Sequence, residues 1–457
     1  MTPAAHTYFA HLSLGASLLS VSPFAILLLA IAVLPLVPAT EPWWEHNRNR
    51  LLVALPCSLA GALLYVVPTG DGGQLLHALV EYLAFLALVG SLYTISGGIH
   101  IQGAFAGFPW INTLFLAVGA VLANVLGTTG ASMLLIRPFL RANHHRKHVV
   151  HQVVFFIFIV SNCGGLLTPL GDPPLFLGFL RGVPFGWTLR LAAPWAVTVG
   201  LLLGVFHILD ERAYLREELG ARENLAAVVA ASARRLHIQG GLNFLWLGLV
   251  LLATLLAGYG LKPWLSLRFG EEQAGLLVAL LQALILGALA LVSYRTTALN
   301  LHRANHFSFG PVKEVAILFL GIFGAMLPAL ALLGAKGASL GLIHPWQYFW
   351  ATGGLSGFLD NAPTYLSMGT LAATTRGLDP AHLGELAARA PRLLEAISCG
   401  AVFMGANTYI GNGPNFMVKA IASHRGLHGP GFFGYMLWSL AVLGPIFLLL
   451  TLLFFRG

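Results

Sequence analysis

The sequence predicts an all-α polytopic membrane protein: an inverted repeat with two re-entrant hairpins, two interrupted transmembrane helices and about ten full spans. Of the 457 residues, 57% are apolar and 9% are charged, whereas a soluble domain carries about 25% charged residues. Apolar stretches of bilayer-spanning length, roughly 20 residues, recur from end to end, and polar breaks interrupt matched segments of the two halves. This composition excludes a water-soluble enzyme, a nucleic-acid-binding protein and a secreted disulfide scaffold.

Full spans are expected where apolar runs reach the length needed to cross a bilayer. They lie at residues 24–38, 51–68, 78–97, 149–171, 190–209, 241–260, 273–293, 313–333, 392–412 and 430–455. Two further stretches, 111–140 and 346–375, fit a single span poorly because glycine and polar residues interrupt them. A break at membrane depth is tolerated only where it is buried in protein or lines a wet cavity, so each stretch is predicted to be a re-entrant hairpin.

The same order of elements occurs twice, which divides the chain into halves of residues 1–240 and 241–457. Each half begins with three spans. The first half continues with a hairpin at about 111–140, a broken span at about 149–180, a span at 190–209 and a cytoplasmic loop at 210–240. The second half continues with a hairpin at about 346–375, a broken span at about 392–420 and a last span at 430–455.

Lysine and arginine residues favour one orientation in the membrane, because basic loops are held on the cytoplasmic side. With the N-terminus outside, most of the 25 basic residues fall in inside loops. They are Arg48, Arg50, Arg137, Arg141, Arg146, Lys147, Arg212, Arg216, Arg222, Arg234, Arg235, Arg295, Arg303, Lys313, Lys419 and Arg425. The hairpin around Asn124 then enters from the cytoplasmic side and the second hairpin from the outside, so the two halves are predicted to be inverted.

A pair of similar segments marks the broken spans. The first reads Thr-Pro-Leu-Gly-Asp-Pro-Pro-Leu-Phe over residues 168–176, and the second reads Thr-Tyr-Ile-Gly-Asn-Gly-Pro-Asn-Phe over residues 408–416. The structural alternative is that proline and glycine merely kink two packed spans. Because the two segments match in position and each follows a broken hairpin, they favour the midplane site of a transporter, where unwound backbone and half-helix ends bind ions.

Two carboxylates, Asp172 and Asp360, lie within the predicted breaks. An ionised carboxylate at the bilayer centre costs at least about 2.5 kcal/mol, so an acid there indicates a function. The structural alternative for each is capping of the half-helix that follows. The remaining candidates for ion binding are neutral and rich in oxygen: Asn124, Thr128, Ser161, Asn162, Asn361, Thr364, Asn407, Thr408 and Asn412.

This set of hard oxygen ligands, without histidine or cysteine, suits a small cation such as Na⁺. The candidate Na⁺ ligands are Asp172, Asn124, Asn361 and Asn407. No lysine or arginine falls inside either break, which argues against a dedicated polyanion site, although half-helix dipoles can partly replace basic groups. A desolvated Asp can hold either a proton or Na⁺, so exchange of one for the other is expected.

Four motifs resemble the ion transporter superfamily: ANVLGTTGASMLLIRP, SNCGGLLTPLGDPPLF, LDNAPTYL and SCGAVFMGANTYIGNGPNF. Over nearly its whole length the chain is most similar to bacterial NhaD-type sodium/proton antiporters and to the related citrate transporter family. The motifs are specific for the superfamily, whose members carry citrate, dicarboxylates, arsenite or sodium.

The resemblance implies a homodimer in which a mobile transport part moves in an elevator-like way against a scaffold. It places Asn124 and Thr128 on the first hairpin tip and Asn361 and Thr364 on the second. It places Ser161, Asn162 and Asp172 on the first broken span and Asn407, Thr408 and Asn412 on the second. The tips depart from the Ser-Asn-Thr pattern of the dicarboxylate branch, which lowers the case for a carboxylate substrate.

The sequence therefore predicts a secondary active transporter of the bacterial inner membrane that exchanges Na⁺ for H⁺, with a sodium- or proton-coupled citrate or dicarboxylate transporter as the alternative. A channel is disfavoured because the broken-helix plan builds one occluded site, and an enzyme is disfavoured because no HExxH or GxSxG motif lies in the predicted spans. The expected partners are small inorganic cations and the lipid bilayer, without nucleic acid or cofactor. Cys57, Cys163 and Cys399 are expected to be free thiols.

Overall fold

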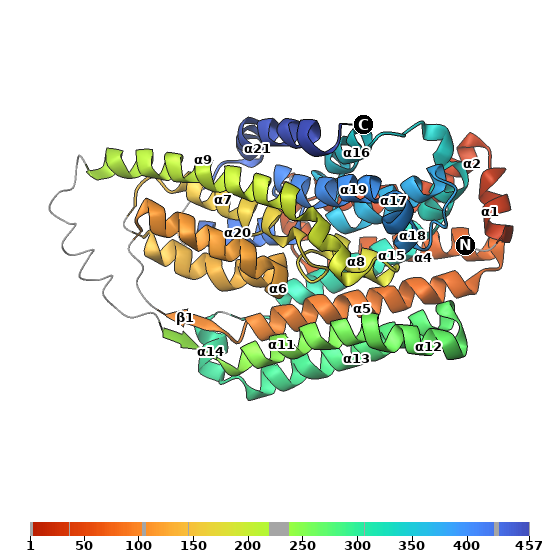
Figure 1. Cartoon of the computed structure of the whole chain (residues 1–457), viewed down its shortest axis with the longest axis horizontal. Coiled ribbons are helices and arrows are strands. Elements are labelled where there is room, and N and C mark those ends of the chain that lie inside the picture. The colour runs from red at the N-terminus through yellow and green to blue at the C-terminus, as the bar shows by residue number, and fades with distance from the viewer. Residues whose placement is uncertain are drawn as a thin grey trace.

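The computed structural model describes residues 3–35, 37–102, 107–144, 146–218, 237–305, 307–424 and 429–456. The structure is 82% helical, and nine of the described helices are long and apolar enough to cross a membrane (Figure 1). The one described sheet is a pair of antiparallel three-residue strands, in which Ile101 lies opposite Ile238. The prediction of an all-α polytopic membrane protein is confirmed.

The elements follow one another in the order shown in Figure 1. They are α1 (Pro3–Ala10), α2 (Leu14–Val33), α3 (Glu41–Trp44), α4 (Asn47–Thr69), α5 (Gly72–Ser96), β1 (His100–Gln102), α6 (Pro109–Ala142), α7 (Val150–Ile159), η1 (Cys163–Leu166), α8 (Pro173–Leu180), η2 (Phe185–Leu191), α9 (Ala192–Glu218), β2 (His237–Gln239), α11 (Leu242–Leu255), the π-helix η3 (Leu256–Leu261), α12 (Lys262–Phe269), α13 (Glu271–Thr296), α14 (Leu299–Ala304), α15 (Gly310–Lys336), η4 (Gly337–Leu340), α16 (Pro345–Ser356), α17 (Asn361–Thr375), α18 (Leu383–Arg389), α19 (Pro391–Met404), η5 (Gly405–Asn407), α20 (Gly413–His424) and α21 (Phe432–Phe454).

Two predicted boundaries are wrong. The first span was expected at 24–38, but α2 begins at Leu14 and ends at Val33. Serines lower the hydropathy of its first half, yet Ser20 Oγ donates to the carbonyl of Ser17 at 2.8 Å, so the buried hydroxyl is satisfied within the helix. The span expected at 190–209 also continues as α9 to Glu218, so the cytoplasmic loop does not begin at 210. Of that loop, residues 219–236, with Arg222, Arg234 and Arg235, lie outside the described residues, as does Arg425.

The first hairpin is α6, which folds back on itself at Gly127. This glycine has φ 73° and ψ 154°, a backbone conformation that residues other than glycine rarely adopt. Asn112 Nδ2 donates to Asn143 Oδ1 at 2.8 Å, although a straight helix would separate these two residues by about 45 Å. The stretch 111–140 is therefore a hairpin, as predicted.

The second hairpin consists of α16 and α17, joined by the turn at residues 357–360. Its open end is closed by a 2.9 Å hydrogen bond between Tyr348 Oη and Thr375 Oγ1. Phe349, near this open end, stacks on Phe455 beside the C-terminus, whereas the open end of the first hairpin contacts the C-terminal part of α9. These two regions lie at opposite ends of the bundle in Figure 1, so the hairpins enter from opposite ends.

Both interrupted spans unwind at matched positions. The first passes from α7 through residues 160–172 to α8, and the second passes from α19 through residues 405–412 to α20. In each break two glycines lie in direct backbone contact: a Cβ on Gly171 would collide with the Gly165 carbonyl, and one on Gly411 would collide with the Gly405 carbonyl. The division of the chain into halves at residue 240 stays a prediction.

Helices α4 and α15 cross closely, and Gly61 packs against the backbone of Ala325 there. A Cβ at position 61 would lie 2.5 Å from Ala325 Cα and 2.7 Å from the Gly324 carbonyl oxygen. In lipid the hydrophobic effect does not drive helices together, so membrane helices associate through close van der Waals packing, which small residues such as glycine allow.

We expect Gly61→Val to destabilise the protein by about 1–3 kcal/mol, because the added side chain must push α4 away from α15. The measurement is the thermal unfolding midpoint of detergent-solubilised protein. Gly287→Val on α13 is the control, since a Cβ there meets nothing within 4 Å. Equal midpoints for the two variants would contradict the close crossing.

Candidate functional site

Asp172 lies at the end of the first break, directly before α8, with only 1% of its surface exposed. Although it occupies the N-cap position of α8, its side chain accepts no capping hydrogen bond. Its Oδ1 instead accepts from Thr128 Oγ1 at 2.7 Å, and its Oδ2 accepts from Asn361 Nδ2 at 2.5 Å. The capping alternative for Asp172 is therefore wrong: its carboxylate joins the tips of both hairpins.

The second broken span supplies a third donor to the same carboxylate. Asn412 Nδ2 lies 3.3 Å from Asp172 Oδ1, and it also donates to the carbonyl of Ser161 at 3.1 Å and to Asn162 Oδ1 at 3.2 Å. Asn162 Nδ2 in turn donates to Asn415 Oδ1 at 2.7 Å. The two breaks thus cross at a continuous network of amide and carboxylate groups, as the matched motifs predict.

The charge of Asp172 is not balanced by a neighbouring base. Its three side-chain donors are neutral, and no lysine, arginine or histidine of the described residues forms an ion pair with it. Asn361 Oδ1 is buried without a hydrogen-bond partner among these residues. A carboxylate beside an unused amide oxygen and a hydroxyl is a donor set that fits a hard monovalent cation.

Asn124, a predicted ion ligand, forms no side-chain hydrogen bond with Asp172 and is engaged with backbone groups instead. Its Nδ2 donates to the Gly164 carbonyl at 2.7 Å, and its Oδ1 accepts from the Leu167 N–H at 2.7 Å. Both partners belong to the unwound segment, whose free backbone groups must be satisfied at membrane depth. Asn124 therefore stabilises the first break.

Threonines hold each break against a hairpin in the same way. Thr168 Oγ1 donates to the Asn124 carbonyl at 2.5 Å, and Thr408 Oγ1 donates to the Gly357 carbonyl at 2.5 Å. The two threonines occupy matched positions of the repeated motif, so the likeness in sequence extends to the contacts. Thr408 is thus a structural residue of the second break.

Asp360 and Thr364 stabilise the returning helix of the second hairpin. Asp360 caps α17 by accepting from the Ala362 N–H at 3.1 Å, and Thr364 Oγ1 donates to the Asp360 carbonyl at 3.0 Å. The capping alternative for Asp360 is confirmed. Asn407 makes no side-chain hydrogen bond to Asp172, and its carbonyl accepts from Ser439 Oγ at 2.8 Å.

A small cavity of about 30 Å³ reaches Asp172 from the side of α5. Its lining includes the first hairpin tip at Gly127 and Thr128, together with Phe85 on α5 and Phe176 on α8. This volume suffices for one water or one small ion. Of the predicted Na⁺ ligands, Asp172 lines this cavity and Asn361 donates to Asp172, whereas Asn124 and Asn407 do neither.

Residues 13–455, nearly the whole chain, match the family described as "Putative citrate transport". The chain belongs to this citrate transport family. No curated protein matches it. Family membership agrees with the predicted resemblance to the ion transporter superfamily and makes the protein a membrane transporter.

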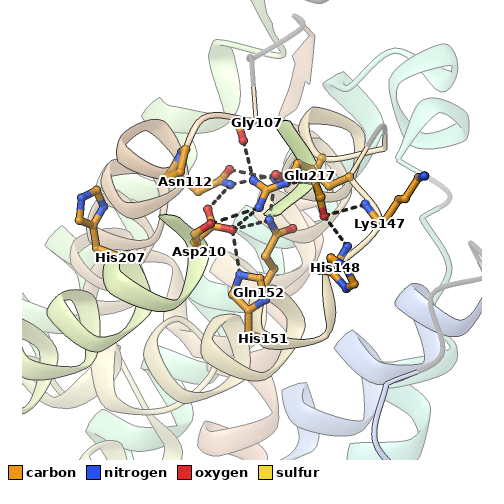
Figure 2. A network of polar contacts seen from close by, with 12 residues as sticks. Gly107, Asn112, Lys147, His148, His151, Gln152, His207, Asp210 and Glu217 are labelled. Atoms are coloured by element: carbon orange, nitrogen blue, oxygen red, sulfur yellow. Dashed lines mark hydrogen bonds and ion pairs between the residues drawn. The ribbon is translucent and has the colours of Figure 1, made fainter. Parts of the chain in front are cut away.

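This member of the citrate transport family has a second buried polar network, centred on Asp210 of α9 (Figure 2). Asp210 Oδ1 accepts from Arg146 Nη2 at 3.0 Å and from Gln152 Nε2 at 3.0 Å, and it pairs with His151 Nε2 at 2.8 Å. Its Oδ2 accepts from Asn112 Nδ2 at 2.8 Å. The Arg146 and Asp210 side chains are 1% and 0% exposed, so this ion pair is fully removed from solvent.

The Asp210 network fixes the open end of the first hairpin to α7 and α9. Asn112 and Asn143 come from the two ends of the hairpin, and Glu217 accepts from the backbone N–H groups of Lys147 and His148 at 3.0 and 2.6 Å. Sequence analysis missed this network because Asp210 was assigned to a solvated loop. The available signal was an acid at the end of an apolar segment, together with a separate run of basic residues.

We expect Asp210→Asn to reduce stability by on the order of 3 kcal/mol, because it removes the fully buried counter-charge of Arg146 and leaves only the partly exposed carboxylate of Glu217, 2.7 Å from Nε. Glu395→Gln is the matched control: it removes a carboxylate whose partner, Arg190 at 3.0 Å, is 56% exposed, and it should cost less than about 1 kcal/mol. Thermal unfolding in detergent measures both. Similar losses for the two variants would contradict the assignment of Asp210 as the anchor of the hairpin.

Proposed function

We propose that this membrane transporter exchanges Na⁺ for H⁺ at Asp172. The observation that supports the proposal is a fully buried carboxylate at the crossing of two helix breaks, surrounded by neutral oxygen and amide groups and without a basic partner. An uncompensated charge is unfavourable in such a place, so binding one monovalent cation or one proton stabilises the site. The two loaded states have the same net charge, and loading with one excludes the other.

The ligands proposed for Na⁺ are the Asp172 carboxylate, Thr128 Oγ1 and the side-chain oxygens of Asn361 and Asn412. The two amides donate to Asp172 in the described conformation, and rotation about their side-chain bonds would present oxygen instead. The Asn361 oxygen is already buried and unpaired. In the proton-loaded state the Asp172 hydroxyl would donate to one of these oxygens.

Movement of the site is proposed to follow the elevator scheme. Hydrogen bonds link the hairpin tips and both breaks into one unit through Asp172, Asn412 and Asn162. A second group of helices, α4, α5 and α15, packs through its own contacts, such as Tyr82 Oη to the Ala316 carbonyl at 3.0 Å. We propose that the first unit slides against the second, in a homodimer of the bacterial inner membrane.

A sodium- or proton-coupled citrate or dicarboxylate carrier is the second candidate, since the matched family is described as putative citrate transport. Amide donors and the N-terminal ends of α8 and α20 at the breaks could bind a carboxylate group. Against it, no lysine or arginine of the described residues contacts the Asp172 network, and Asp172 would repel an anion.

Transport by purified protein in liposomes with an internal pH dye separates the two candidates. Na⁺, Li⁺, K⁺ and citrate are added one at a time against a proton gradient. A pH change evoked by Na⁺ without citrate supports the antiporter. A response that requires citrate supports the second candidate and contradicts the first.

We expect Asp172→Asn to abolish exchange of Na⁺ for H⁺, because a neutral amide can neither take up the proton nor balance the cation. The protein should remain folded, since the substitution keeps the size of the side chain. Asp360→Asn is the control, because an amide oxygen can still cap α17 and exchange should be weakened less. Exchange at the unaltered rate and Na⁺ affinity in Asp172→Asn would show that the carboxylate is structural.

The proposed inversion of the two halves predicts the sidedness of the two hairpins. Cysteine in place of Lys147, beside the open end of the first hairpin, should react with an impermeant thiol reagent only from the cytoplasmic side. Cysteine in place of Trp346, which is 45% exposed at the start of the second hairpin, should react only from outside. Right-side-out and inside-out vesicles provide the comparison. Reaction of both from the same side would refute the inverted arrangement.

A further inference from the structure

A cavity of about 720 Å³ opens at the end of the bundle where α5 begins and α8 ends. Its charged lining consists of Asp71, Glu81, Arg181, Lys262 and Asp379. Partial burial opposes ionisation of Asp379, but hydrogen bonds from His382 and from the Ala381 N–H more than offset it and hold the pKa of this carboxyl below its ordinary value. We call this cavity the vestibule.

The vestibule and the small cavity at Asp172 follow one seam, between α5 and α8. On α5, Gln74, His77 and Glu81 line the vestibule, and Phe85 and Leu88 line the small cavity. Their spacing of three or four residues places them on one face of the helix. On α8 the two cavities are one helical turn apart, since Leu180 lines the vestibule and Phe176 lines the cavity at Asp172.

A thin apolar barrier separates the two cavities. Leu180 packs against Val80 and Ala84, while Phe85 and Phe176 are 1% and 0% exposed. One helical turn covers about 5.4 Å along the axis, so the barrier is about one layer of side chains thick. Hydrated ions do not cross such a layer while it is closed.

An ion pair joins the two walls at the vestibule side of this barrier. Arg181 directly follows α8 and donates to Glu81 of α5 through Nε at 3.2 Å and Nη2 at 3.1 Å. Both side chains are mostly buried, at 8% and 19% exposed, so the pair is weakly screened by solvent. Because α8 begins next to Asp172, the pair links the proposed transport unit to α5.

We propose that the vestibule is the outer access route by which a hydrated monovalent cation reaches Asp172, and that the Glu81–Arg181 pair latches it shut. The proposal rests on the proposed function and names its route. Separation of α8 from α5 breaks the pair, opens the layer of Leu180, Phe85 and Phe176, and connects the two cavities. The vestibule carboxylates outnumber its permanently charged bases, Arg181 and Lys262, so its local field favours cations.

The test uses Leu88→Cys, a buried position on α5 that lines the small cavity behind the barrier, in a background where Cys57, Cys163 and Cys399 are replaced by serine. A cationic, impermeant thiol reagent is added from outside to the protein in right-side-out vesicles. Neutralising the latch with Glu81→Gln and Arg181→Gln should raise the labelling rate about tenfold, and the charge-swapped pair Glu81→Arg and Arg181→Glu should restore protection. The matched control neutralises the Arg190–Glu395 pair, in which Nε and Oε1 are 3.0 Å apart and which lies outside the vestibule.

Sodium-dependent proton exchange is measured before and after complete labelling. Loss of exchange on labelling supports the access route, whereas unchanged exchange overturns it even if Asp172 remains the ion site. Equal labelling rates with the latch and the control pair neutralised overturn the latch. If unlabelled protein exchanges no Na⁺ for H⁺, the proposed function fails, and labelling at position 88 still reports separately on the opening of the barrier.

Discussion

Peptide groups that leave a helix inside a membrane must find partners within the protein, because lipid offers none. Two breaks at membrane depth therefore require two sets of supporting side chains, and these occur at matched positions. Thr168 and Thr408 each donate to a hairpin carbonyl, and the glycine contacts keep each unwound segment closed on itself. The hairpins are thus needed to make the breaks possible, and the breaks in turn bring Asp172 to the crossing point.

The buried Asp172 carboxylate has no positively charged side chain of the described residues beside it. Asp172 has hydrogen-bond donors but no counter-charge, whereas Asp210 is equally buried and has Arg146 beside it. Asp210 is neutralised within the protein, whereas Asp172 is not. An uncompensated carboxylate such as Asp172 suits binding and release of a cation, and a paired one such as Asp210 suits a fixed anchor for the hairpin.

Sequence reasoning predicted the two helix breaks because their signals are local: glycine, proline and polar residues within apolar segments, repeated once. It could not decide which polar residues contact Asp172, since side chains of one short break point in different directions. Asn124 and Asp172 are both polar residues within predicted breaks. Asn124 hydrogen-bonds to backbone groups of the unwound segment, whereas Asp172 accepts hydrogen bonds from side chains of three other elements. The Asp210 network is not predicted because its residues come from segments that are distant in the sequence. The start of α2 is predicted too late because its buried serines lower the hydropathy, as a polar helix end would.

The short β1–β2 ribbon has a mechanical consequence. It pairs His100 with Gln239 and Gln102 with His237, so the chain departs toward the first hairpin and returns from α9 at one place. The chain connections of residues 107–218 to the described helices on either side therefore meet at one junction, although these residues also pack against α5 and α17. A shift of these residues would strain that one junction of the chain and not two widely separated connections.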